Sequence, residues 1–272
     1  DVSGYNITNT ITGTTTVEGM KTWNVPEGTT LPEKITVKLV RSDGKEESKA
    51  VTAADNWTYK WENLPLYSED GKTAYTYTVD EEEVAGYKKD VSGYNITNTI
   101  TSVKITKVDI SDAHELEGAH LQILDSNGTV VAEWDSAKEA HEVTGLKTGE
   151  LYTLRETVAP DGYTITTDTT FELDEHGKLK EDKTTTTTKD GVLLVEDTAT
   201  SVKVRKVDIT NAEELPGAHI QIWEKTSEGE KLVTEWDSTK EDKVVEKLKT
   251  NTTYILRETI APDGYTITTD TT

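Results

Sequence analysis

Three glutamates stand at matching places in three stretches that alternate like β-strands. In each stretch an aromatic residue, an aliphatic residue and the glutamate occupy every second position, so all three lie on one face of a strand. Burying an ionised carboxylate is costly unless it is paired or neutralised, so each glutamate needs a partner. The triplets are Tyr77, Val79 and Glu81; Tyr152, Leu154 and Glu156; and Tyr254, Leu256 and Glu258.

A lysine lies on the apolar face of an earlier strand in each of the same three regions. Alternation groups it with aliphatic residues, while Lys104, Lys203 and Arg205 fall on the opposite, wet face. These inward lysines are the natural partners of the glutamates. The groups are Val17, Gly19, Lys21 and Trp23; Val103, Ile105 and Lys107; and Val202, Val204 and Lys206.

A third polar residue faces the core in two regions. Asn98 shares a face with Ile96 and Ile100, and Asp197 shares one with Leu193 and Val195. The second assignment is weaker, because the opposite face of that strand is also partly apolar and consists of Val192, Leu194 and Glu196.

Two interpretations of these groups stay open. In the simpler one, the residues snorkel at strand ends or form buried ion pairs. In the other, burial lowers the lysine pKa and raises the glutamate pKa, and the lysine amine attacks the Asn or Asp carbonyl while the glutamate shuttles protons. The amide forms once inside the folded chain, so the chemistry is self-modification and not enzymatic turnover. A salt bridge needs no third polar member, and Asn98 cannot complete an ion pair.

The elements that position these residues are expected to be almost entirely β-strands. Thr and Val are abundant, and short alternating runs are separated by turn signals such as Asp70-Gly71 and Asp190-Gly191. No stretch shows a sustained 3.6-residue apolar period. This pattern is typical of antiparallel sandwiches.

Internal repeats predict the boundaries. Residues 1–12 recur identically at 90–101, so we expect 1–12 to be the last strand of an upstream repeat and 13–101 to be a first module. A second module, 102–200, begins at Ser-Val-Lys-Ile, and a third, 201–272, begins at Ser-Val-Lys-Val. The third is expected to stop before its last strand.

Composition excludes several classes of function. Cysteine is absent, which removes disulfides and thiolate chemistry. The net charge of -22 argues against nucleic acid and anionic membrane partners. No apolar run is long enough to span a membrane, none of the five histidines falls in a metal-binding pattern, and no cofactor motif occurs.

The residues also carry a resemblance to known modules. The first module resembles the B-type repeats of Gram-positive collagen adhesins in Lys21-Thr-Trp23, Asn56 to Trp61, Tyr77 to Glu81 and Ile96-Thr-Asn98-Thr. The other two resemble SpaA-type pilin domains in Lys107-Val-Asp109, the Glu-Leu-x-Gly-Ala segment and the stretch Tyr152 to Tyr163, which matches the pilin E-box.

This resemblance implies tandem prealbumin-like or reverse immunoglobulin-like sandwiches. It also implies isopeptide bonds from Lys21 to Asn98 with Glu81, and from Lys107 to Asp197 with Glu156. The implied function is a structural stalk of a surface adhesin or pilus-like protein, extracellular and anchored to the cell wall by a segment outside this stretch. Such a stalk has a distal adhesive domain and the cell wall as its partners. The alternative is that the modules themselves bind a host protein or glycan.

Two parts of the chain depart from the pattern, the third module and the N-terminal stretch. Lys206 and Glu258 match the family, but their acceptor strand is expected beyond Thr272, and Asn9 is an acceptor without a donor. We expect a monomer. The alternative is head-to-tail exchange, in which the strand carrying Asn9 completes the third module of another copy.

Overall fold

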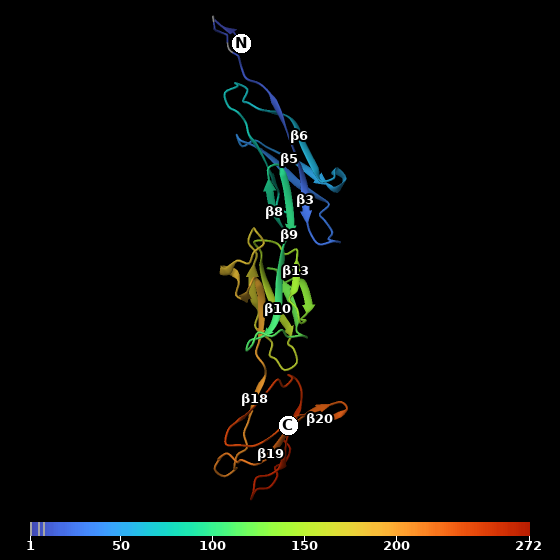
Figure 1. Cartoon of the computed structure of the whole chain (residues 1–272), viewed down its shortest axis with the longest axis vertical. Helices are drawn as coiled ribbons and strands as arrows, with labels where there is room; N and C mark the ends of the chain where they lie inside the picture. The colour runs from blue at the N-terminus through green and yellow to red at the C-terminus, as the bar shows by residue number, and fades with distance from the viewer. Residues whose placement is uncertain (1, 5, 8) are drawn as a thin grey trace. The chain divides into compact units, whose positions relative to one another are not determined.

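The structure is a computed structural model of residues 1–272, and it describes all of them except 1, 5 and 8. Nearly all regular structure is β-strand, with two short 3-10 helices, η1 (Ala53–Asp55) and η2 (Glu181–Lys183) (Figure 1). The predicted all-β fold class is confirmed. Among the described residues, no helix has the length and apolar character that a membrane crossing requires.

The chain forms two compact units. Unit 1 comprises Asp1–Lys104, Glu142–Tyr152 and Thr170–Thr185, and unit 2 comprises Ile105–His141, Thr153–Thr169 and Thr186–Thr272. Each site described below lies within one unit.

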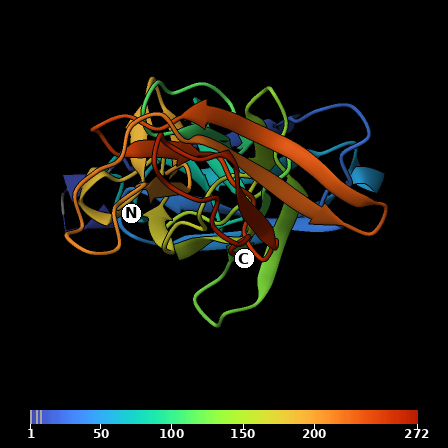
Figure 2. The same ribbon diagram turned by 90° about the horizontal axis from the view of Figure 1, so that it is seen from below.

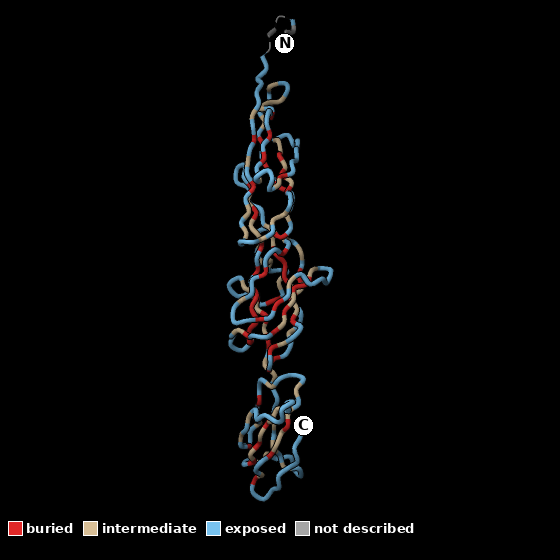
Figure 3. The backbone as a smooth tube through the Cα atoms, turned by 90° about the vertical axis from the view of Figure 1, so that its right-hand side faces the viewer, coloured by how far each residue is buried: buried red, intermediate tan, exposed pale blue. Residues whose placement is uncertain are grey.

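The first module is a sandwich of two sheets with strand orders β6-β3-β9-β8 and β5-β4-β7. Its core lies between the sheets, and buried residues alternate with exposed ones along the strands (Figure 3). Gly19 is required where strand β3 passes Tyr94, because an added Cβ would lie 1.8 Å from the Tyr94 carbonyl oxygen. The strands are β3 (Thr14–Asn24), β4 (Lys34–Arg41), β5 (Glu46–Thr52), β6 (Thr58–Pro65), β7 (Tyr77–Glu81), β8 (Tyr87–Ser92) and β9 (Asn95–Ile100).

The repeated twelve-residue stretch contains a hairpin: residues 90–101 hold the end of β8 and the whole of β9, where the last strand of the module was expected. Ser92 pairs with Asn95 across a two-residue turn, and Gly93 in that turn has φ of +61°. A positive φ at the first turn position is what a type II′ hairpin turn requires. The N-terminal copy repeats this pairing in β1 (Val2–Ser3) and β2 (Asn6–Ile7).

The second module also has two sheets, with strand orders β13-β10-β17-β16 and β12-β11-β14-β15. Alternate residues of β11, β14 and β17 are buried, as the sequence predicts for half-buried strands. The strands are β10 (Ser102–Asp109), β11 (His120–Leu124), β12 (Val130–Asp135), β13 (His141–Thr144), β14 (Leu151–Val158), β15 (Thr169–Glu172), β16 (Thr187–Lys189) and β17 (Val192–Asp197).

The third module has smaller sheets, with strand orders β18-β21 and β20-β19-β22. Its long β19–β20 hairpin is the orange arm in Figure 2. Among the described residues, strand β18 pairs only with β21, whereas its counterpart β10 has two neighbours. The strands are β18 (Ser201–Val204), β19 (His219–Thr226), β20 (Gly229–Asp237), β21 (Lys243–Glu246) and β22 (Tyr254–Ile260).

Candidate functional site: three lysine–glutamate pairs

The first site joins both sheets of the first module. Lys21 lies on β3 and Glu81 on β7, and Lys21 Nζ lies 3.3 Å from Glu81 Oε1 with both side chains buried. Strand β9 runs parallel to β3, with Ile96 opposite Lys21 and Asn98 opposite Trp23. The predicted lysine and glutamate are therefore in contact, and the predicted asparagine lies buried on the adjacent strand.

The polar groups of this site are poorly satisfied. Asn98 Oδ1 and both carboxylate oxygens of Glu81 make no hydrogen bond to the part of the chain that the structure describes. The Trp23 ring covers the lysine, with its centroid 4.5 Å from Lys21 Nζ. Burial lowers the pKa of Lys21 to about 8, and the opposing attraction of Glu81 does not cancel this effect. About a tenth of the Lys21 amine is therefore uncharged at pH 7.

The second site is more deeply buried. Lys107 on β10 lies 3.0 Å, Nζ to Oε1, from Glu156 on β14. Lys107 Nζ also contacts Asp197 Oδ1 on β17, and all three side chains have no exposed surface. The structure thus brings together all three residues that the sequence singles out here.

Burial changes the chemistry of the acceptor in this second site. It raises the pKa of Asp197 to about 7, against the opposing effect of Lys107, and the neighbouring Glu156 carboxylate adds to the increase. Asp197 therefore holds a proton at a pH where an exposed aspartate is ionised. A protonated carboxyl group is open to attack by an amine, whereas a carboxylate repels a nucleophile.

The third site contains the same pair without the third member. Lys206 Nζ lies 3.0 Å from Glu258 Oε1, and the lysine side chain keeps 14% of its surface exposed. No Asn or Asp from the described residues is in contact with this lysine. The pair alone lacks a carbonyl that the amine could attack.

A backbone hydrogen bond that the sequence analysis missed orients two of the glutamates. The amide of Thr166 donates to Glu156 Oε2 at 2.8 Å, and the amide of Thr268 donates to Glu258 Oε2 at 2.8 Å. In the second module Oε1 faces the lysine, whereas in the third module Lys206 Nζ contacts both oxygens of Glu258, Oε1 at 3.0 Å and Oε2 at 3.1 Å. A backbone donor leaves no side-chain signature, and the repeated Thr-Ile-Thr-Thr stretches at 164–167 and 266–269 are the only hint in the sequence.

Asn9 and the acidic loops add no further site. Asn9 is exposed and lies outside any strand. Asp109, Asp112 and His114 place possible metal-ligand atoms within 4.8 Å of one another. However, Asp109 accepts hydrogen bonds from Ser111 and Tyr163, and Asp112 is paired with His114, so we assign this cluster no ligand.

Comparison with known families agrees with the sandwiches and their repeats. The model of the Cna protein B-type domain matches residues 17–99. The model of the prealbumin-like fold domain SpaA matches residues 101–188 and 200–272, which together are more than half of the chain. The chain belongs to the SpaA prealbumin-like domain family. The predicted resemblance to collagen-adhesin B-type repeats and SpaA-type domains is thereby confirmed.

Several individual proteins are similar to this SpaA-family chain. The collagen adhesin of Staphylococcus aureus is 35% identical over 114 residues, which is 39% of this chain and 10% of that protein. The open form of the pilus adhesin SpaC from Lactobacillus rhamnosus GG aligns with a TM-score of 0.49 and 20% identity, covering 94% of this chain and 37% of that one. A single B repeat unit of the S. aureus collagen-binding protein aligns with a TM-score of 0.32 and 26% identity, covering 69% of this chain and 100% of that one.

Proposed function

We propose that this chain is a spacer segment of a Gram-positive surface protein, whose first and second modules are locked by intramolecular isopeptide bonds. The observation that carries the proposal is the second site, where Lys107 Nζ touches both Glu156 and Asp197 and all three side chains are fully buried. We also propose that the chain is divided into three modules, with bounds at 13–101, 102–200 and 201–272.

The bond-forming step follows from the protonation states. The uncharged Lys21 amine attacks Cγ of Asn98, the new C–N bond forms, and the asparagine nitrogen leaves as ammonia. Glu81 carries the proton from the lysine nitrogen to the leaving group. At Asp197 the same attack by Lys107 expels water, with Glu156 as the proton carrier.

An ordinary buried ion pair explains the structure less well. Two buried charges must recover a large desolvation cost, and Asn98 carries no charge with which to help. An amide would remove the charge of the buried Lys21 amine, which makes no hydrogen bond within the described part of the chain. The polar groups in the core are therefore explained by a product that contains fewer charges.

The position of the bonds suits a spacer. They tie β3 to β9 and β10 to β17, closing loops that run from 21 to 98 and from 107 to 197. Closing a loop of this size stabilises a domain by roughly 4 to 5 kcal/mol in the chain-entropy model. Tension that enters one of these strands passes through an amide to the other without separating the sheet. A distal adhesive domain and a cell-wall anchor would then be the partners of the segment.

The test is the intact mass of the chain under denaturing conditions. The parent chain should lack one ammonia and one water relative to its sequence. Glu81→Gln should restore the ammonia alone, and Glu156→Gln the water alone. Glu258→Gln is the matched control, because the third site has no acceptor among the described residues, and it should restore neither. A parent chain of unmodified mass would overturn the proposal.

A further inference from the structure

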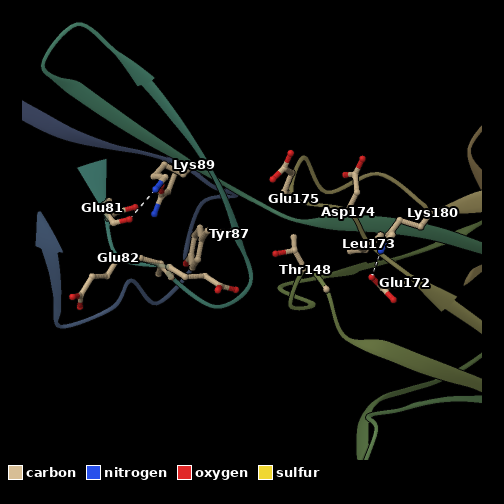
Figure 4. Close-up of a pocket in the computed structure, with 14 residues that line it drawn as sticks. Glu81, Glu82, Tyr87, Lys89, Thr148, Glu172, Leu173, Asp174, Glu175 and Lys180 are labelled. Atoms are coloured by element: carbon tan, nitrogen blue, oxygen red, sulfur yellow. Dashed lines mark hydrogen bonds and ion pairs between the residues drawn. The ribbon is translucent and has the colours of Figure 1, made fainter. Parts of the chain in front are cut away.

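The first module contains a second lysine beside the reaction site, Lys89. It lies on β8 directly opposite Asn98 of β9, so the two residues are cross-strand neighbours. Lys89 Nζ donates to the backbone carbonyl of Glu81 at 2.8 Å (Figure 4). It also contacts the Asp80 carboxylate. The Lys89 side chain therefore contacts the strand that carries Glu81. The Lys89 backbone position pairs with Asn98, the proposed acceptor.

The place of Lys89 in the sandwich gives this contact a structural role. Strand β8 is the edge of one sheet and β7 is the edge of the other. Lys89 crosses from one edge to the other, at the side of the sandwich where Glu81 and Asn98 lie. Glu81, Tyr87, Lys89 and Asn98 are among the residues that line one pocket, and within it Glu81 and Asn98 stay buried.

The charge of Lys89 acts on the same site. The charged and titratable groups near Lys21 are Glu81 and Asp80 from β7, Lys89 from β8 and Tyr59 from β6. Asp80 is paired with Lys89, and the Tyr59 hydroxyl donates to the Tyr94 carbonyl at 2.6 Å. Lys89 is thus the cation that opposes the effect of Glu81 on Lys21, and it helps burial to lower the pKa of Lys21.

We propose that Lys89 is a positioning residue for the Lys21–Asn98 bond: it holds Glu81 in place through the Glu81 backbone carbonyl and places a positive charge at the edge of the sandwich where Glu81 and Asn98 lie. This inference rests on the proposed function. The second module has no such lysine: β16 and β17 pair Thr187, Thr188 and Lys189 with Leu194, Leu193 and Val192, away from Asp197.

The first experiment titrates Lys21 without any reaction. In the full chain carrying Asn98→Ala the first module has no acceptor, and the Lys21 resonance of 13C-labelled lysine is assigned by its loss in Lys21→Met. Its midpoint should lie near pH 8. Adding Lys89→Met should raise the midpoint by about half to one pH unit. Lys88→Met, at the adjacent and exposed position of β8, should leave it unchanged.

The second experiment measures bond formation in newly synthesised full-length chains that are quenched at intervals and digested. The branched peptide from the second module serves as an internal clock, because differences in synthesis and folding affect both modules. Lys89→Met should slow the first module several-fold relative to the second at pH 7. Lys89→Arg, which keeps the charge and the donors, should restore most of the rate, and Lys88→Met should match the parent chain.

The outcomes separate the two proposals. An unchanged Lys21 midpoint in Lys89→Met would overturn the charge effect even if the rate fell, because a merely structural tie slows the reaction without moving the titration. An unchanged rate would overturn the positioning role. If the mass of the parent chain shows no loss of ammonia, the proposed Lys21–Asn98 cross-link is wrong. The titration then still decides whether Lys89 acts on Lys21.

Discussion

The second and third modules contain the same lysine–glutamate pair in two different surroundings. The distance from lysine Nζ to glutamate Oε1 is 3.0 Å in both, and a threonine amide donates to Oε2 at 2.8 Å in both. The burial differs. Lys107 has no exposed surface, whereas Lys206 keeps 14% of its side chain exposed.

The difference follows from one strand. In the second module β17 lies beside β10 and carries Asp197, whereas β18 of the third module pairs with β21 alone in the described part of the chain. The lysine–glutamate geometry therefore does not depend on the last strand. That strand carries Asp197, the proposed acceptor, and it lies beside β10 where Lys107 is fully buried.

The largest expected effect comes from removing each lysine in turn. Lys107→Met should destabilise the second module by about 5 kcal/mol, because the proposed loop-closing amide could no longer form and two buried carboxylates would remain without a cation. Lys206→Met should cost the third module clearly less, because it breaks an ion pair that is partly exposed and leaves one carboxylate with its threonine donors. Hydrogen exchange resolved by peptide measures each module separately.

Equal losses of stability in the two modules would contradict this prediction. They would mean that Asp197 contributes no more to the second module than an ion pair. The first module serves as a control for both variants, and its exchange rates should stay at the parent values.

The next effect is a pH dependence that only the second module should show. Burial raises the pKa of Asp197 to about 7, and Lys107→Met removes the lysine that opposes this increase. A raised folded-state pKa means that the folded module binds more protons than the unfolded chain between about pH 4 and 7. The linear second module should therefore be most stable in acid and lose stability as pH rises through this window.

Lys206→Met should respond more weakly in the same titration, because no second carboxylate faces Glu258 among the described residues. If the parent chain carries the proposed amide, Asp197 does not titrate there, so the pH dependence of the second module's stability should disappear. A pH dependence of stability that persists in the second module of the parent chain would mean that a group other than Asp197 causes it.

The sequence predicted the fold class and the face on which each site residue lies. Alternation with period two places Lys21, Lys107, Asn98 and Asp197 inward, and each of them is buried. Alternation could not show that residues 90–101 form a hairpin, because the turn depends on the backbone of Gly93. It also could not predict Lys89, which lies on an exposed strand and reaches its contacts only because two sheet edges meet there.

The smallest expected effect tests whether the last strand also shields a contact that lies away from the lysine. The Tyr163 hydroxyl donates to Asp109 at 2.8 Å, and the Tyr265 hydroxyl donates to Asp208 at 2.7 Å. Tyr163 is 5% exposed and its neighbour Thr164 donates to the Thr198 carbonyl just after β17, whereas Tyr265 is 45% exposed.

Because Asp109 is buried, Tyr163→Phe leaves a carboxylate short of one donor and should cost the second module about 1 to 2 kcal/mol. Water can replace the lost donor at Asp208, so Tyr265→Phe should change the third module by less than about 0.5 kcal/mol. Hydrogen exchange at β14 and β22 measures both. Equal costs would mean that the tyrosine contacts do not depend on the last strand. The stabilising effect of that strand on the second module would then be confined to the lysine site.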